Sequence, residues 1–158
     1  MLSVTEWEGQ PRIDLRQWWP SLGNVKRPSK RGVSMPLHRY AMLRSTLPFV
    51  DNVLARVKEG AKDIDEKWHL GSNMFVTISS PYSCVNIRQW FKKDVDGDLL
   101  PGRGISLNAT QWNEFLLADA RLDAIVPDLK TVTVCPLDHQ NQEGYLICSE
   151  CNPNGLYL

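Results

Sequence analysis

Four residues near the end of the chain have the types and the spacing of metal ligands. Cys135 and His139 form a C-x3-H pair, eight residues follow, and Cys148 and Cys151 form a C-x2-C pair. Thiolate sulfur and imidazole nitrogen are the donors that structural Zn²⁺ sites use in sets of four. The pattern predicts a structural zinc site in a tail, residues 131–158, with too few apolar residues to fold well alone. Free thiols at strand ends, or a redox-active pair of cysteines, stay open as alternatives.

A second group of residues combines arginine with aromatic rings, and it occurs twice. The stretch IDLRQWW, residues 13–19, returns 72 positions later as VNIRQWF, residues 85–91. Binding of single-stranded nucleic acid with little sequence preference needs cations for the phosphates and exposed rings on which bases stack. A tryptophan on a strand is equally often core filler, so no single ring decides between the two roles.

The same period of 72 residues extends far beyond these two stretches. It aligns the chain with itself without a gap, and a fixed period of this length indicates a duplicated structural unit. We predict one unit over residues 1–57, a linker over 58–68 and a second unit over 69–130, before the tail. The matching pairs are Arg16 and Arg88, Trp18 and Trp90, Trp19 and Phe91, Arg31 and Arg103, Gly32 and Gly104, Tyr40 and Trp112, and Asp51 and Asp123.

Each unit is predicted to consist of strands followed by one helix, which is an α+β architecture. RIDLRQWW and CVNIRQWF alternate apolar and polar residues, and Gly or Pro in EGQP and SSPYS marks the turn before each. RGVSM and RGISL follow as short final strands. The tail is predicted to be β-rich, with two short strands.

The predicted helices follow these final strands directly. In the second unit, Asn108 and Gln111 have the spacing of a capping box, and an apolar stripe runs on to Val126. In the first unit the helix spans about residues 36–57, and Pro48 is expected to kink it or to restart it.

These segments together resemble the single-stranded-DNA-binding domain of the positive cofactor four family of transcriptional coactivators. The resemblance rests on RIDLRQWW followed by VKRPSKRGVSMPLHRYAML, and on CVNIRQWF followed by DGDLLPGRGISLNATQWNEFL, which is the closer copy. It implies, for each unit, a curved antiparallel sheet of about four strands with one helix. Family members usually carry one unit and dimerise through their helices. We infer that the two units of this chain pair with each other as an intramolecular pseudo-dimer, so that the chain is a monomer.

The resemblance also implies which residues bind DNA. In the first unit they are Trp7, Arg16, Trp19, Lys30 and Arg31, to which the loop VKRPSKR adds Lys26 and Arg27; in the second they are Tyr82, Arg88, Phe91 and Arg103. Strand alternation instead puts Trp18 on the face of the first strand arginine and Trp90 on the face of the second. Either Trp19 and Phe91 or Trp18 and Trp90 are therefore the stacking rings.

The formal net charge is zero, but the charges are distributed unevenly. Residues 1–60 hold ten Lys or Arg against five Asp or Glu, and residues 61–158 hold eight against thirteen. We therefore expect the first unit to face a polyanion and to carry most of the salt dependence of binding. The short basic loop is also compatible with a solvated surface or a nuclear import signal.

Several classes of function have no support in the sequence. No apolar run reaches the length of about 18 residues that a membrane span needs. A phosphate-binding glycine loop, a nucleophile elbow and a nuclease-like cluster of carboxylates with histidine are all missing from the sequence. We predict a non-catalytic protein, intracellular and nuclear, that binds single-stranded or unwound DNA in transcription together with the transcription machinery. The alternative is a protein-interaction adaptor with the same fold, whose zinc-stabilised tail is the contact surface.

Overall fold

The computed structural model describes residues 1–20 and 22–155. The first unit contains the strands β1 (Leu2–Trp7), β2 (Gln10–Pro20) and β3 (Lys26–Pro36), followed by the helix α1 (Leu37–Lys58). The three strands form one antiparallel sheet in the order β1-β2-β3. This unit therefore has one strand fewer than the expected number of about four.

The second unit contains all four expected strands. They are β4 (Asp65–Gly71), β5 (Met74–Ser79), β6 (Cys84–Lys92) and β7 (Leu99–Asn108), and the helix α2 (Ala109–Ile125) follows. The sheet is antiparallel with the order β4-β5-β6-β7. The strand β4 begins at Asp65, inside the range 58–68 that the sequence suggested as a linker. The sequence did not indicate this strand, because it begins with three charged residues, Asp65, Glu66 and Lys67, which are exposed at the edge of the sheet.

The repeat is visible in the core, where residues 72 positions apart are buried in pairs. Alternate residues of β2 and β3 point toward the helices, as the period of two requires, and the same positions of β6 and β7 do so in the second unit. The buried pairs are Ile13 and Val85, Leu15 and Ile87, Val33 and Ile105, Met35 and Leu107, Tyr40 and Trp112, Leu43 and Phe115, and Val50 and Leu122. The duplication is therefore a duplication of the core.

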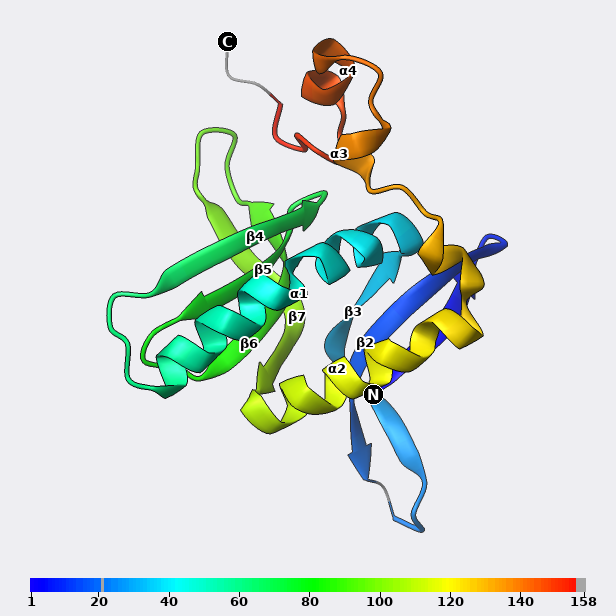
Figure 1. The fold of residues 1–158 in the computed structure, drawn as a ribbon, viewed down its shortest axis with the longest axis vertical. Coiled ribbons are helices and arrows are strands. Elements are labelled where there is room, and N and C mark those ends of the chain that lie inside the picture. The colour runs from blue at the N-terminus through cyan, green and yellow to red at the C-terminus, as the bar shows by residue number, and fades with distance from the viewer. Residues whose placement is uncertain (21, 156–158) are drawn as a thin grey trace.

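The two units pack on each other through their helices and their last strands. The helix α1 contacts β4 and β5 of the second sheet as well as β2 and β3 of its own, and α2 contacts β1 of the first sheet. The last strands β3 and β7 are also in contact. Figure 1 shows α1 lying across the strands of the second sheet, and α2 lower in the same view. This arrangement confirms the expected pairing of two sheet-and-helix units within one chain.

Polar side chains join the two helices. Asp119 of α2 accepts hydrogen bonds from Tyr40 Oη at 2.5 Å and from Arg44 Nε at 2.8 Å. Arg44 Nη1 donates to Asp123 at 2.6 Å, and these bonds raise the pKa of Arg44 although burial opposes its charged form. Burial and the bond to Asp119 likewise raise the pKa of Tyr40. The helices are thus held by charged groups beside the apolar core.

A related bond occurs at the equivalent position of the other helix. Trp112, which corresponds to Tyr40 in the repeat, donates from Nε1 to Asp51 at 3.2 Å, and Asp51 corresponds to Asp123. Each helix therefore accepts, on an aspartate of the same repeat position, a hydrogen bond from the other helix. The two acceptor positions are equivalent in the repeat, but the donors are not, because Arg44 and not Tyr40 donates to Asp123.

The helix ends agree with the sequence in most respects. The capping box of α2 is present, since Gln111 N donates to Asn108 Oδ1 at 2.9 Å and Asn108 N donates to Gln111 Oε1 at 3.0 Å. Ile125, expected in the apolar stripe, is exposed at the last turn. Of the two outcomes expected at Pro48, a kink or a restart, the restart is wrong, because α1 runs unbroken through this residue.

The tail is helical, so the predicted strands are wrong. A 3₁₀ turn (Pro127–Lys130) precedes the tail, and the tail itself contains the short helices α3 (Cys135–Asp138) and α4 (Gln142–Ile147). Residues 131–134, directly before Cys135, pair with no strand of the described chain. Pro136 fits the first turn of α3, and the Asn141 side chain caps α4 by accepting from Gly144 N at 2.7 Å. No helix in residues 1–20 and 22–155 is long and apolar enough to cross a membrane.

Candidate nucleic-acid interface and metal centre

The strand arginines Arg16 and Arg88 lie on the sheet faces that point away from the helices. Each is paired across the sheet with a glycine, Arg16 with Gly32 and Arg88 with Gly104. A Cβ atom at Gly104 would lie 2.3 Å from Arg88 Cγ, and one at Gly32 would lie 2.9 Å from Arg16 Cβ. The glycines therefore leave room for the arginine side chains to lie over the neighbouring strand.

A β-bulge follows each of these arginines. Arg16 pairs with Gly32 but Trp18 pairs with Pro28, so residues 29–31 lie opposite the single residue Gln17. In the second unit residues 102–103 lie opposite Gln89 in the same way. The bulges place Lys30 and Arg31 in one unit, and Arg103 in the other, beside the strand arginine. All three side chains are exposed.

The basic stretch VKRPSKR, expected as a loop, is the start of β3. Lys26 pairs with Pro20 and Arg27 with Trp19, so the cations extend along a hairpin arm beside an aromatic ring. Pro28 is tolerated in β3 because β3 is an edge strand of the first sheet. Four exposed cations, Lys26, Arg27, Lys30 and Arg31, therefore follow one strand.

The aromatic residues at the strand ends differ in exposure. Trp19 is 49% exposed and Phe91 is 48% exposed, whereas Trp18 and Trp90 are half-buried. One face of Trp90 is occupied, because Lys67 Nζ lies 3.8 Å from its ring centroid and 4.2 Å from that of Phe75. Lys67 was missed from the sequence, since it belongs to the strand that has no counterpart in the first unit.

The other two expected rings lie at equivalent turns. Trp7 ends β1 before the turn into β2 and is 66% exposed, and Tyr82 lies between β5 and β6 and is 69% exposed. A hollow of about 540 Å³ beside Trp7 is lined by Thr5, Glu6, Arg12 and Ser34. Both rings are therefore accessible to a ligand.

The two strand arginines differ in their partners. Arg16 donates to both carboxylate oxygens of Asp14, at 3.0 and 3.1 Å, and these bonds raise its pKa. The equivalent position in the second unit is Asn86, and Arg88 donates to the Gly102 carbonyl at 3.4 Å. Within residues 1–20 and 22–155, no carboxylate lies within ion-pair distance of Arg88. The second unit therefore offers its strand arginine without a bound carboxylate.

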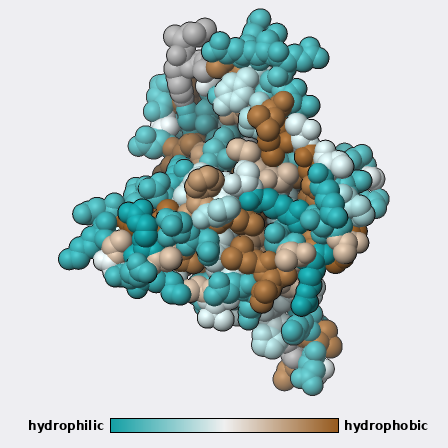
Figure 2. Space-filling view, in the orientation of Figure 1, coloured by the Kyte–Doolittle hydropathy of each residue, from teal (hydrophilic) through white to brown (hydrophobic). Residues whose placement is uncertain are grey.

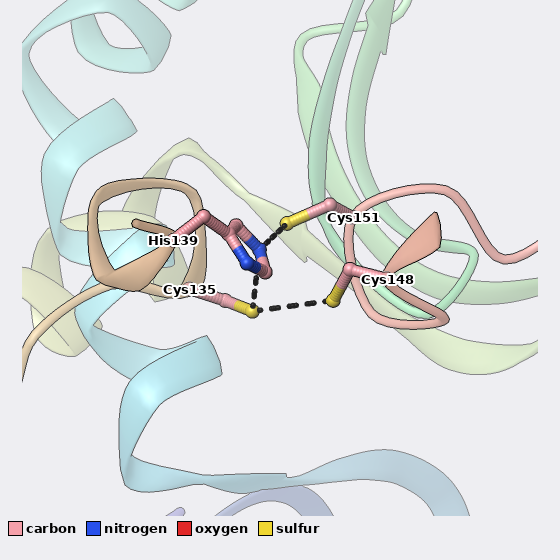
Figure 3. Close-up of side chains that lie close together, drawn as sticks. All are labelled: Cys135, His139, Cys148 and Cys151. Atoms are coloured by element: carbon pink, nitrogen blue, oxygen red, sulfur yellow. Dashed lines mark hydrogen bonds between the residues drawn. The ribbon is translucent and has the colours of Figure 1, made fainter. Parts of the chain in front are cut away.

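The four candidate metal ligands of the tail come together at one point. Their ligand atoms all lie within 4.8 Å of one another, and Figure 3 shows the side chains pointing toward a common centre. The Sγ atom of Cys135 lies 3.6 Å from His139 Nε2 and 3.6 Å from Cys148 Sγ, and His139 Nε2 lies 3.3 Å from Cys151 Sγ. A tetrahedral zinc site with bonds of about 2.0–2.3 Å has edges of about this length. The four residues therefore fit a metal ion of that geometry.

Glu150, between the two cysteines of the C-x2-C pair, connects this cluster to the first unit. Its carboxylate accepts hydrogen bonds from Arg39 Nε and Nη2, both at 2.8 Å, and lies 3.3 Å from His38 Nε2. Burial disfavours the charged carboxylate, but the bonds from His38 and Arg39 outweigh it and lower the pKa of Glu150 to about 2. No sequence pattern pointed to this contact, because the partners are more than a hundred residues apart.

Two segments of the chain, residues 1–46 and 68–118, match the model of the family Transcriptional Coactivator p15 (PC4). Together they cover more than half of the chain. The chain belongs to this family. No curated protein and no solved structure gives a significant match.

Each of the two PC4 segments lies within one structural unit and ends inside its helix, so the family domain itself is duplicated. Membership in the PC4 family supports a role in transcription and in DNA binding. All the DNA-binding candidates of the sequence lie inside the matched segments, from Trp7 to Arg31 in the first and from Tyr82 to Arg103 in the second. The cluster of Cys135, His139, Cys148 and Cys151 lies outside both and is an addition to the PC4 domain.

Proposed function

We propose that this protein is a non-catalytic single-stranded-DNA-binding protein that acts in the nucleus as a coactivator or regulator of transcription on unwound DNA. One observation carries the proposal: both units place a strand arginine, a basic bulge and an exposed ring at the same strand end. Cations for phosphates beside rings for bases are what an unpaired strand requires. Contacts with the transcription machinery follow from the family.

The exposed rings decide which aromatic residues we assign to stacking. We assign this role to Trp19 and Phe91, because each presents about half of its surface to solvent, and to Trp7 and Tyr82 at the turns. Trp18 and Trp90 are half-buried, and we assign them to packing. The phosphate contacts are assigned to Arg16, Lys26, Arg27, Lys30, Arg31, Arg88 and Arg103.

Replacing both Lys30 and Arg31 by alanine is expected to reduce the salt dependence of binding to a single-stranded oligonucleotide. Each phosphate contact contributes about 0.7 to the slope of log K against log salt, so the slope should fall by about 1.4. Trp19→Ala should instead cost about 1–3 kcal/mol in binding with the slope nearly unchanged, because stacking releases no counterions. Fluorescence anisotropy at several salt concentrations measures both quantities.

The matched control is the double replacement of Lys62 and Lys130, two exposed lysines outside both sheets, which removes the same charge. Its slope should equal that of the wild-type protein. An equally strong interaction with duplex DNA, or an unchanged slope for the first variant, would contradict the proposal.

The alternative function is a protein-interaction adaptor. It is favoured by exposed apolar residues in the tail, Leu137 at 79% and Ile147 at 78%. Figure 2 shows that the face carrying the helices is otherwise largely hydrophilic, with hydrophobic side chains gathered near its middle. A wild-type protein with no measurable affinity for single-stranded DNA would favour the adaptor.

We also propose that the tail binds one structural Zn²⁺ through Cys135, His139, Cys148 and Cys151. The purified protein should contain about one equivalent of zinc by elemental analysis, and a chelator should loosen the tail while both sheets stay folded. Cys148→Ser should abolish zinc binding, whereas Cys84→Ser, which changes the cysteine outside the cluster, should retain it. Zinc-free protein with an ordered tail would refute the assignment.

A further inference from the structure

The tail contacts the turn between β4 and β5 through several hydrogen bonds. The backbone carbonyl of Glu150 accepts from Ser72 N at 2.7 Å. The side-chain amides of Asn73 and Asn154 donate to each other, at 3.0 and 2.9 Å. The side chain of Glu150 also packs against the turn, because a Cβ atom at Gly71 would lie 2.1 Å from Glu150 Oε1. Backbone and side-chain atoms of the tail therefore both contact the β4–β5 turn.

The backbone of this turn has the positive φ angles of a two-residue hairpin loop. Gly71, Ser72 and Asn73 have φ angles of +128°, +49° and +60°. Residues other than glycine rarely adopt positive φ, and conformations of this kind persist where the surroundings enforce them. In this structure the surroundings of Ser72 and Asn73 include the segment that begins at Glu150.

The same turn holds the end of β6. Trp90 N donates to the carbonyl of Asn73 at 2.7 Å, and Gln89 Nε2 donates to the carbonyl of Ser72. Gln89 is the residue opposite the bulge that carries Arg103, and Phe91 follows Trp90 directly. Hydrogen bonds therefore connect Glu150, which lies between two cysteines of the metal cluster, through the turn to the strand end that we assign to DNA binding.

We propose that Glu150 is a positioning residue, and that the metal-bound tail clamps the β4–β5 turn and through it fixes the end of β6 for DNA binding. This inference rests on the proposed function, because it takes both the zinc site and the role of Phe91 from it. The carboxylate of Glu150 accepts hydrogen bonds from Arg39, and Glu150 lies in the chain between Cys148 and Cys151 of the metal cluster. Among the described residues of the first unit no strand corresponds to β4, so the clamp acts on the second unit.

Amide hydrogen exchange in the full-length, zinc-loaded protein tests this inference without DNA. The reporters are the amides of Ser72 and Trp90, which donate to Glu150 and to Asn73. Removing zinc with a chelator, or replacing Glu150 by alanine, should accelerate exchange at both by about tenfold or more, because local opening of the turn becomes easier. Amides of β2 in the first unit should keep their rates.

Two further variants separate positioning from a general loss of stability. Glu150→Gln keeps an oxygen that can accept from Arg39, so it should restore part of the protection that Glu150→Ala loses. Glu143→Ala, which removes an exposed carboxylate of α4, should change neither rate. Unchanged exchange at Ser72 and Trp90 after zinc removal and in Glu150→Ala overturns the inference, as does a protein that binds no zinc and still protects both amides.

The proposed function is judged by a different measurement, the affinity of the wild-type protein for a single-stranded oligonucleotide. A wild-type protein that fails to bind DNA but shows the expected exchange would refute the DNA-binding function and leave the clamp of the turn standing. A protein that binds DNA with unchanged exchange would do the reverse. The two failures are therefore distinguishable.

Discussion

Replacing Asp119 by alanine is expected to lower the free energy of unfolding by about 3 kcal/mol. Its carboxylate accepts from Tyr40 Oη and Arg44 Nε, and its side chain is only 16% exposed. Removing one partner of a largely buried charged pair costs about 3–5 kcal/mol, because the other partner stays desolvated. Arg44 keeps Asp123 as a second partner, which places the effect at the lower end of that range. Urea denaturation followed by circular dichroism measures it.

The control for this variant is Asp96→Ala, which removes an exposed aspartate in the turn between β6 and β7. It should change the free energy of unfolding by less than about 0.5 kcal/mol.

The wild-type protein should sediment as a monomer at micromolar concentration, because the bonds of Asp119 lie within one chain. A stable dimer that separates only on unfolding would show that the units pair between chains instead.

Exchanging Asp14 and Asn86 between the units should change DNA affinity in opposite directions. Asp14→Asn removes the carboxylate that occupies Arg16, so it should tighten binding of a single-stranded oligonucleotide by about tenfold. Asn86→Asp places a carboxylate beside Arg88 and should weaken binding by a similar factor. A hydrogen bond to a charged group is worth about 1.5–3 kcal/mol, and about 1.4 kcal/mol corresponds to tenfold in affinity. Titration at fixed salt, followed by fluorescence anisotropy, gives both values.

This pair of variants also separates charge from stability. Asn86→Asp can form the same bidentate pair that Asp14 forms with Arg16, so weaker binding would not come from a damaged fold. If neither variant changes affinity, the strand arginines do not contact phosphate. If Asp14→Asn weakens binding, the carboxylate orients Arg16 for DNA. The sequence alone favoured the first unit because of its positive charge, and the Asp14 contact acts against that advantage.

Features that depend on local pattern or on the repeat were predictable from the sequence. The period of 72 residues predicted a duplicated unit, and residues 72 positions apart are buried in pairs because each copy has the same fold. The capping box at Asn108 and Gln111 is local and was predictable from spacing alone. The spacing of Cys135, His139, Cys148 and Cys151 likewise predicted the ligand cluster that the structure contains.

Other features were decided only by the tertiary structure. The strand β4 could not be recognised from its charged residues, because its pairing with β5 and the burial of Leu70 against the core make it a strand. The tail forms the helices α3 and α4 instead of the expected strands, and residues 131–134 before them pair with no strand of the described chain. Asp119 meets Tyr40, and Glu150 meets Arg39, across 79 and 111 residues of chain. Such pairs carry no local signature, since their geometry exists only after the two units and the tail have packed against one another.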